Sequence, residues 1–143
     1  MALHQEHVVL RVVAKMLIPM ILLFALYVQF HGDYGPGGGF QAGVIFAAGI
    51  ILYALVFGLG AARQVVPPSV LRRLAALGVL LYAGVGVFSL LSGYAFLDYD
   101  AIDPEHPSHG QHLGILLVEL GVGITVASVM LMLFFSFAGR GRQ

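Results

Sequence analysis

Glu119 is the one acidic residue that lies inside a long apolar run of this sequence. An ionised carboxylate is costly in an apolar environment, so this side chain must face protein or water. Such acids commonly handle protons or cations, and the alternative is a structural acid that hydrogen-bonds to a neighbouring helix. We take Glu119 as the first candidate for an ion path.

The glycine-rich stretch 31–43, called the glycine tract below, reads HGDYGPGGGFQAG and is the second candidate. His31 and Asp33 are the groups in it that could line or gate an ion path. Pro36 fixes its own φ angle, and the glycines allow the backbone to approach a neighbouring element closely. We expect a shaped turn rather than a slack hinge, with these packing residues: Pro36, Gly37, Gly38, Gly39, Phe40 and Gly43.

The segment 98–112 holds four of the seven acidic residues and three of the six histidines. These groups could bind a divalent metal or form a cation-attracting vestibule, and a solvated loop is the default interpretation. Pro104 and Pro107 disfavour a helical ligand cage, so we expect no metal site. The absence of cysteine excludes disulfides and thiolate-held iron–sulfur clusters. With no nucleophile beside a suitable base, we expect no cofactor, no catalytic residue and no enzymatic activity.

The composition places these groups in a membrane protein. The 143 residues are 59% hydrophobic and only 10% charged, with a mean hydropathy of +0.94, whereas soluble domains carry about 25% charged residues. A membrane-crossing helix needs about 20 mostly apolar residues. Four segments meet this requirement: 12–30, 40–61, 71–94 and 113–137. The sequence therefore predicts an all-α polytopic membrane protein, in which a single domain, 1–143, has four transmembrane helices.

The seven Lys and Arg residues lie on one side of these spans. They occur before or at the start of the first span, between the second and third spans, and after the fourth. Under the positive-inside rule, both termini face the cytoplasm, while the glycine tract and the loop 94–112 face outside. Glu119 is then expected in the outer third of the membrane. Within the first span, Pro19 should kink the helix and Lys15 should reach the inner interface.

Small residues at helical spacing mark where membrane helices pack together. The last three spans each have such a face: Gly39, Gly43, Ala47, Ala54 and Gly58; Gly78, Tyr82, Gly86, Ser89 and Gly93; Gly114, Gly121, Thr125 and Ser128. Glu119 points to the side of its helix opposite Gly121 and Thr125. Both sides of the fourth span therefore need neighbours other than lipid, which indicates a chain embedded among other subunits.

Several of these residues carry a resemblance to a known family. They are Arg11, Pro19, Tyr27, His31-Gly32 and Pro36-Gly-Gly-Gly-Phe40, followed by Gly43. This pattern resembles the MnhB family of the multisubunit monovalent cation/proton antiporters, which are known as Mrp or Mnh. The segment 119–125 is similar to the family's fourth helix. The resemblance implies a small, non-catalytic component of a complex in the bacterial cytoplasmic (inner) membrane. Such complexes exchange cytoplasmic sodium for external protons and are related to the membrane arm of respiratory complex I.

The resemblance also implies partners: the other subunits of a hetero-oligomeric complex, the lipid bilayer, and Na+ and H+ as transported ions, but no nucleic acid. The family often has His-Gly-His where this chain has Asp33, so a role for a second histidine is not carried over. The same motif recurs in the C-terminal part of a large component of the same antiporters and in related membrane hydrogenases. A structural membrane component of a redox-driven ion pump is therefore the alternative. A small multidrug exporter fits less well, because such exporters carry their acid in the first span.

Overall fold

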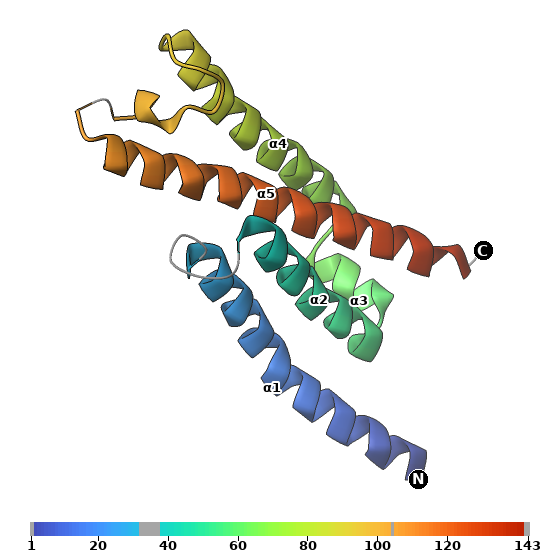
Figure 1. Ribbon diagram of the computed structural model, residues 1–143. Helices are drawn as coiled ribbons and strands as arrows, with labels where there is room; N and C mark the ends of the chain where they lie inside the picture. Colours follow the sequence, from blue (N-terminus) through green and yellow to red (C-terminus); the bar gives the residue numbers. More distant parts are fainter. Residues whose placement is uncertain (1, 32–37, 104, 142–143) are drawn as a thin grey trace.

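The computed structural model describes residues 2–31, 38–103 and 105–141. Five α-helices follow one another along the chain: α1 (Ala2–His31), α2 (Gly39–Phe57), α3 (Leu59–Val65), α4 (Pro68–Leu91) and α5 (Pro107–Ala138) (Figure 1). Two short 3-10 helices, η1 (Tyr99–Ala101) and η2 (Gly139–Gly141), precede and follow α5. All of the α-helices except α3 are long and apolar enough to cross a membrane. The predicted all-α class with four membrane-crossing helices is confirmed, and the sidedness of the termini stays a prediction.

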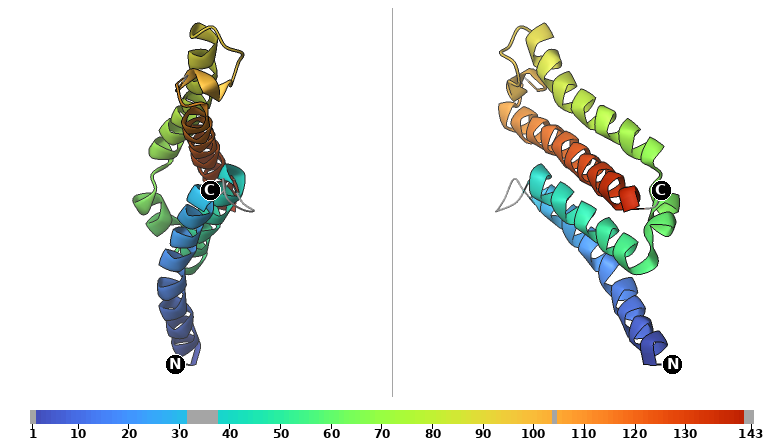
Figure 2. Two further views of the ribbon diagram at one scale, coloured as in Figure 1. Left: turned by 60° about the vertical axis from the view of Figure 1, so that its left-hand side comes forward. Right: turned by 90° about the vertical axis from the view of Figure 1, so that its right-hand side faces the viewer.

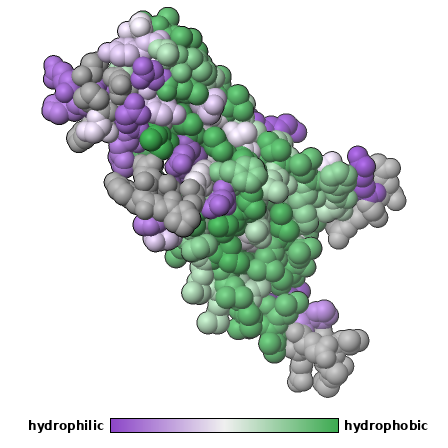
Figure 3. Space-filling model, in the orientation of Figure 1, coloured by the Kyte–Doolittle hydropathy of each residue, from purple (hydrophilic) through white to green (hydrophobic). Residues whose placement is uncertain are grey.

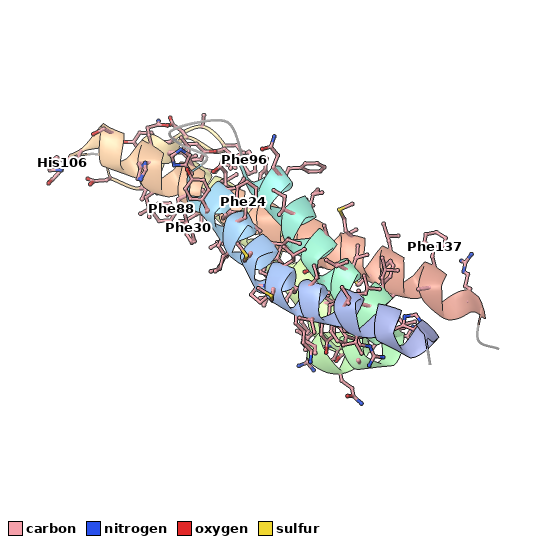
Figure 4. All side chains as sticks on the ribbon, turned by 90° about the horizontal axis from the view of Figure 1, so that it is seen from below. Phe24, Phe30, Phe88, Phe96, His106 and Phe137 are labelled. Atoms are coloured by element: carbon pink, nitrogen blue, oxygen red, sulfur yellow. The ribbon has the colours of Figure 1, made fainter. Side chains whose placement is uncertain are left out.

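The long helices form a row in the order α1, α2, α5 and α4 (Figures 1 and 2). α2 packs against α1 on one side and against α5 on the other, and α4 packs against the far side of α5. The face of the row seen in Figure 3 is apolar along the helices, with polar residues chiefly near the helix ends. Phe24, Phe30 and Phe137 are among the exposed rings of the row (Figure 4). Such a surface suits lipid and partner subunits.

α5 can be the central helix because small residues open both of its sides to close packing. Toward α4, a Cβ built on Gly78 would lie 2.7 Å from the Gly121 carbonyl oxygen, and the Thr125 hydroxyl donates to that same oxygen at 2.8 Å. Toward α2, a Cβ built on Gly43 would lie 2.7 Å from the Gly123 carbonyl oxygen. Helices of the same chain thus cover both sides. The packing of these two sides therefore gives no evidence by itself for or against neighbouring subunits.

Replacing Gly78 by Ala should weaken the contact between α4 and α5. The added methyl group would overlap the Gly121 backbone, and overpacking of this kind destabilises a protein by about 1–3 kcal/mol. Gly84 is a matched control on the same helix, because a Cβ there would meet no atom within 4 Å. Ala at Gly84 should leave stability unchanged or raise it slightly. Thermal denaturation of the detergent-extracted protein compares the variants, and equal melting temperatures would contradict this packing.

Two glycines that we assigned to packing faces instead follow helix ends. α2 ends at Phe57, directly before Gly58, and α4 ends at Leu91, two residues before Gly93. These glycines have φ angles of 100° and 86°. These angles favour glycine, and a Cβ on either residue would meet nothing within 4 Å. The second span is therefore shorter than predicted, whereas α5 starts at Pro107, ahead of the predicted position 113. α1 starts earlier than predicted and continues through Pro19 as one helix.

The core lies beside α3, the short helix that connects α2 to α4, and includes side chains of α2 and of the last part of α5. Its buried side chains are Ala47, Ile50, Ala54, Ala62, Leu71, Leu131 and Phe135. Arg63 of α3 donates a hydrogen bond from Nη2 to the Phe135 carbonyl oxygen at 3.2 Å. Lys15 Nζ lies 5.7 Å from the ring centroid of Phe57, the last residue of α2. These basic residues lie toward the end of the helix bundle at which both chain termini are found. The loop between α4 and α5 lies at the opposite end of the bundle (Figure 1).

Candidate functional site

Glu119 lies where α5 passes the first turn of α2. It is about three turns, or about 18 Å, from the start of α5 at Pro107, yet it lies beside Gly39, the first residue of α2. A Cβ built on Gly38 would be 3.3 Å from Glu119 Oε1, and a Cβ on Gly39 would overlap the Glu119 carbonyl oxygen. The missing side chains of these two glycines therefore leave the space that the glutamate occupies. The structure brings together two features that are far apart in the sequence, the acid and the glycine tract.

The start of α2 is an environment that favours negative charge. The first N–H groups of a helix have no partner within the helix, and the aligned peptide dipoles place a partial positive charge there. α2 has no acidic residue in its first turn, and its N-cap residue, Gly38, has no side chain that could accept these hydrogen bonds. The Glu119 carboxyl group, contributed by α5, lies at this position. This arrangement stabilises an anion within an apolar span.

Tyr99 lies near Glu119 and did not stand out in the sequence. Burial raises the pKa of Tyr99 above the usual value of a phenol, and the neighbouring Tyr82 and Glu119 raise it further. Tyr99 therefore stays protonated at neutral pH and can donate a hydrogen bond. η1 packs against two glycines of α5. The Tyr99 ring lies where Gly114 lacks a side chain, and a Cβ on Gly110 would be 2.6 Å from the Tyr99 carbonyl oxygen.

The loop between α4 and α5 folds back onto the end of α4. The Phe96 ring occupies the space that a side chain of Gly86 would fill, and the buried Ser89 hydroxyl donates to the Asp98 carbonyl oxygen at 2.8 Å. Gly86 and Ser89, which we assigned to a helix-packing face, therefore pack against this loop. Among the residues of the loop and helices that the structure describes, no three His, Asp or Glu side chains form a group that could hold a metal ion.

Gln29 is a buried polar residue that we did not predict from the sequence. Its side-chain Oε1 occupies a notch at Gly123, where a Cβ would overlap it. Gly123 lies about one helical turn beyond Glu119 on the same side of α5. Gln29 is only 5% exposed although it lies just before the end of α1. We missed Gln29 because an amide near the end of a span is expected at the membrane interface. Its helical spacing from the small residue Ala25 was the signal that could have indicated a packed position.

The other predicted site residues lie on α1, on the first turns of α2, or outside the described part of the chain. His31 is the last residue of α1, and its ring stacks on Tyr27 with 4.9 Å between the ring centroids. Phe40 is 64% exposed, so within this chain it is not the packing anchor that we expected. Pro19 is exposed within α1. Three predicted residues lie outside the described part of the chain: Asp33, Pro36 and Gly37.

Comparison with known proteins identifies the family. A family model described as "Domain related to MnhB subunit of Na+/H+ antiporter" matches residues 9–132. The chain belongs to the MnhB family. Curated relatives of this MnhB-family chain include proteins named "Putative antiporter subunit mnhB2" from Staphylococcus haemolyticus (strain JCSC1435) and Staphylococcus aureus (strain Newman). They are 31% and 33% identical to it over 137 residues, which cover 94% of this chain and 96% of each relative.

The family that we predicted from the glycine tract and the segment 119–125 is therefore confirmed. The relatives are bacterial, and this MnhB-family chain has four helices that can cross a membrane. Together these findings make it a multi-pass bacterial membrane protein.

Proposed function

We propose that this chain is a non-catalytic membrane subunit of a multisubunit Na+/H+ antiporter, and that Glu119 handles the exchanged ions. The matched family and the curated relatives are described as antiporter subunits, which favours this function over a structural role in a redox-driven pump. The observation that carries the proposal is the position of the Glu119 carboxylate against Gly38 at the start of α2. A carboxylate within an apolar span is costly, and the helix dipole offsets part of that cost.

The proposed chemistry is competition between a proton and a sodium ion for one carboxylate. The protonated side chain of Glu119 is neutral and suits an apolar span, whereas the ionised side chain attracts a small cation that prefers oxygen ligands. One carboxylate does not hold both ions at once, so loading one releases the other. His31 and Asp33, with the glycine tract, line the outer mouth of this route in our proposal.

A single acid serves only part of the distance across a bilayer, so the proposed route continues in partner subunits. The broad apolar surface of the helix row leaves room for such neighbours (Figure 3). We place the complex in the bacterial cytoplasmic membrane with both termini of this chain in the cytoplasm, because its basic residues flank the spans on one side.

Deleting this chain from its host should remove sodium-driven proton movement in inside-out membrane vesicles. A plasmid copy of the full chain should restore it, and the readout is the sodium-induced recovery of a quenched pH-sensitive dye. Unchanged exchange in vesicles that lack the chain would contradict the proposal. Loss of electron-transfer-driven sodium uptake, with exchange intact, would instead support the redox-driven alternative.

A further inference from the structure

A narrow apolar groove runs along one face of the helix row. It has a volume of about 250 Å³ and is lined by α1, α2, α5 and the start of α4. Among the described residues that line it, only Gln29 and Ser128 have polar side chains. Its floor includes Gly43 and Gly123, which bring α2 and α5 together. An unfilled groove in a membrane would forfeit van der Waals contacts along its whole length, so an occupant is expected.

The Gln29 amide shows what kind of occupant this is. Its Nε2 is buried and has no hydrogen-bond partner within the part of the chain that the structure describes. Its Oε1 lies at Gly123, on the floor of the groove. A buried donor without an acceptor is unfavourable, and its free-energy cost is largest where water is excluded. The occupant should therefore combine an apolar body with one hydrogen-bond acceptor near Gln29.

The dimensions of the groove favour a slender occupant over a helix. Its lining on α5 runs from Leu120 to Leu131, a length of about 16 Å at the usual helical rise. A volume of about 250 Å³ spread over that length makes the groove long and narrow. An unbranched hydrocarbon chain suits a channel of this width, whereas a helix could only lie over it.

We propose that the groove binds one acyl chain of a membrane phospholipid, whose ester carbonyl accepts a hydrogen bond from Gln29 Nε2. Gln29 lies just before the end of α1, so the ester sits at that end of the groove and the chain extends toward Leu71 and Leu131. Because Nε2 is buried, the Gln29 side chain must turn to bring this donor to the carbonyl. The bound chain covers the seam between α2 and α5, about one helical turn from Glu119. This inference does not depend on the proposed antiport.

Photolabelling in native membranes tests the proposal with the chain in its own assembly. The probe is a phosphatidylglycerol with a diazirine in its acyl chain, and the expected product is a labelled α5 peptide that contains Ile124. Ala127→Phe fills the groove and should abolish this label. Gln29→Leu removes the donor at similar size and should reduce labelling about fivefold, the factor that corresponds to one hydrogen bond.

Leu80→Phe is the control, because Leu80 is exposed and lines a different groove between α4 and α5. The Leu80→Phe variant should be labelled at Ile124 to the same extent as the wild type. An unlabelled wild type, or equal labelling in the wild type and Ala127→Phe, would overturn the proposal. Unchanged labelling in Gln29→Leu would overturn the role of the amide, and this variant decides alone if Ala127→Phe does not assemble. A crosslink from position 124 to another subunit, formed in the absence of the lipid probe, would show that a protein occupies the groove instead.

Discussion

Replacing Glu119 by Gln should reduce sodium–proton exchange to background while the chain still assembles. Glutamine has the same shape and keeps the contact with Gly38, but it neither binds a proton in this pH range nor carries a negative charge for sodium. The start of α2 then faces a neutral amide. Dye-quench assays in inside-out vesicles measure exchange, and co-purification with partner subunits measures assembly. Glu119→Ala should fail in the same way, because it also removes the carboxylate.

Glu105→Gln is the matched control for this experiment. Glu105 lies in the exposed loop before α5, so its neutralisation should leave exchange close to the wild-type level. Normal exchange in an assembled Glu119→Gln variant would contradict an ion-handling role. It would leave Glu119 as a structural acid that holds the start of α2.

Replacing Gly39 by Ala should destabilise the protein and also reduce exchange. Its new methyl group would overlap the Glu119 carbonyl oxygen, so α2 and α5 would have to separate at the level of the glutamate. Overpacking of this kind costs about 1–3 kcal/mol in tightly packed regions, and the separation would also move the carboxylate away from the start of α2. Both the melting temperature of the extracted protein and its exchange activity should fall. Gly43→Ala should act in the same direction, because its Cβ would lie 2.7 Å from the Gly123 carbonyl oxygen.

Gly60→Ala serves as the control for the glycine variants. Gly60 lies in α3, and a Cβ there would meet no atom within 4 Å, so this variant should be as stable as the wild type or slightly more so. A Gly39→Ala variant with wild-type melting temperature and exchange would contradict the close contact between α2 and Glu119.

The four long helices of this fold could be predicted from the sequence, but the short helix α3 and the order of the helices in the row could not. Long apolar segments identify membrane helices because length and hydropathy are local properties. Gly43 and Gly78 were recognisable as packing residues by their spacing, although spacing does not say which helix they meet. Gly58 and Gly93 fitted the same spacing yet follow helix ends, because a glycine serves equally for close packing and for a positive φ angle.

The candidate site was predictable in its parts and not as a whole. Glu119 and the glycine tract each stood out by composition, but their meeting depends on α2 and α5 lying side by side, which is a tertiary contact. Gln29 and Tyr99 were missed because polar residues near span ends are expected at the interface. The buried Gln29 packs at Gly123 and the half-buried Tyr99 packs at Gly114, because the missing side chains of these glycines leave space that only the folded chain reveals.

The most direct test of the central claim is sodium protection of Glu119 against a carbodiimide. Dicyclohexylcarbodiimide reacts with protonated carboxyl groups in apolar surroundings, and mass spectrometry of the α5 peptide measures its attachment in native membranes. If sodium and a proton compete for this carboxylate, Glu119 should be modified without sodium, and added sodium should slow the modification at constant pH and ionic strength. Modification at the same rate with and without sodium would contradict the account.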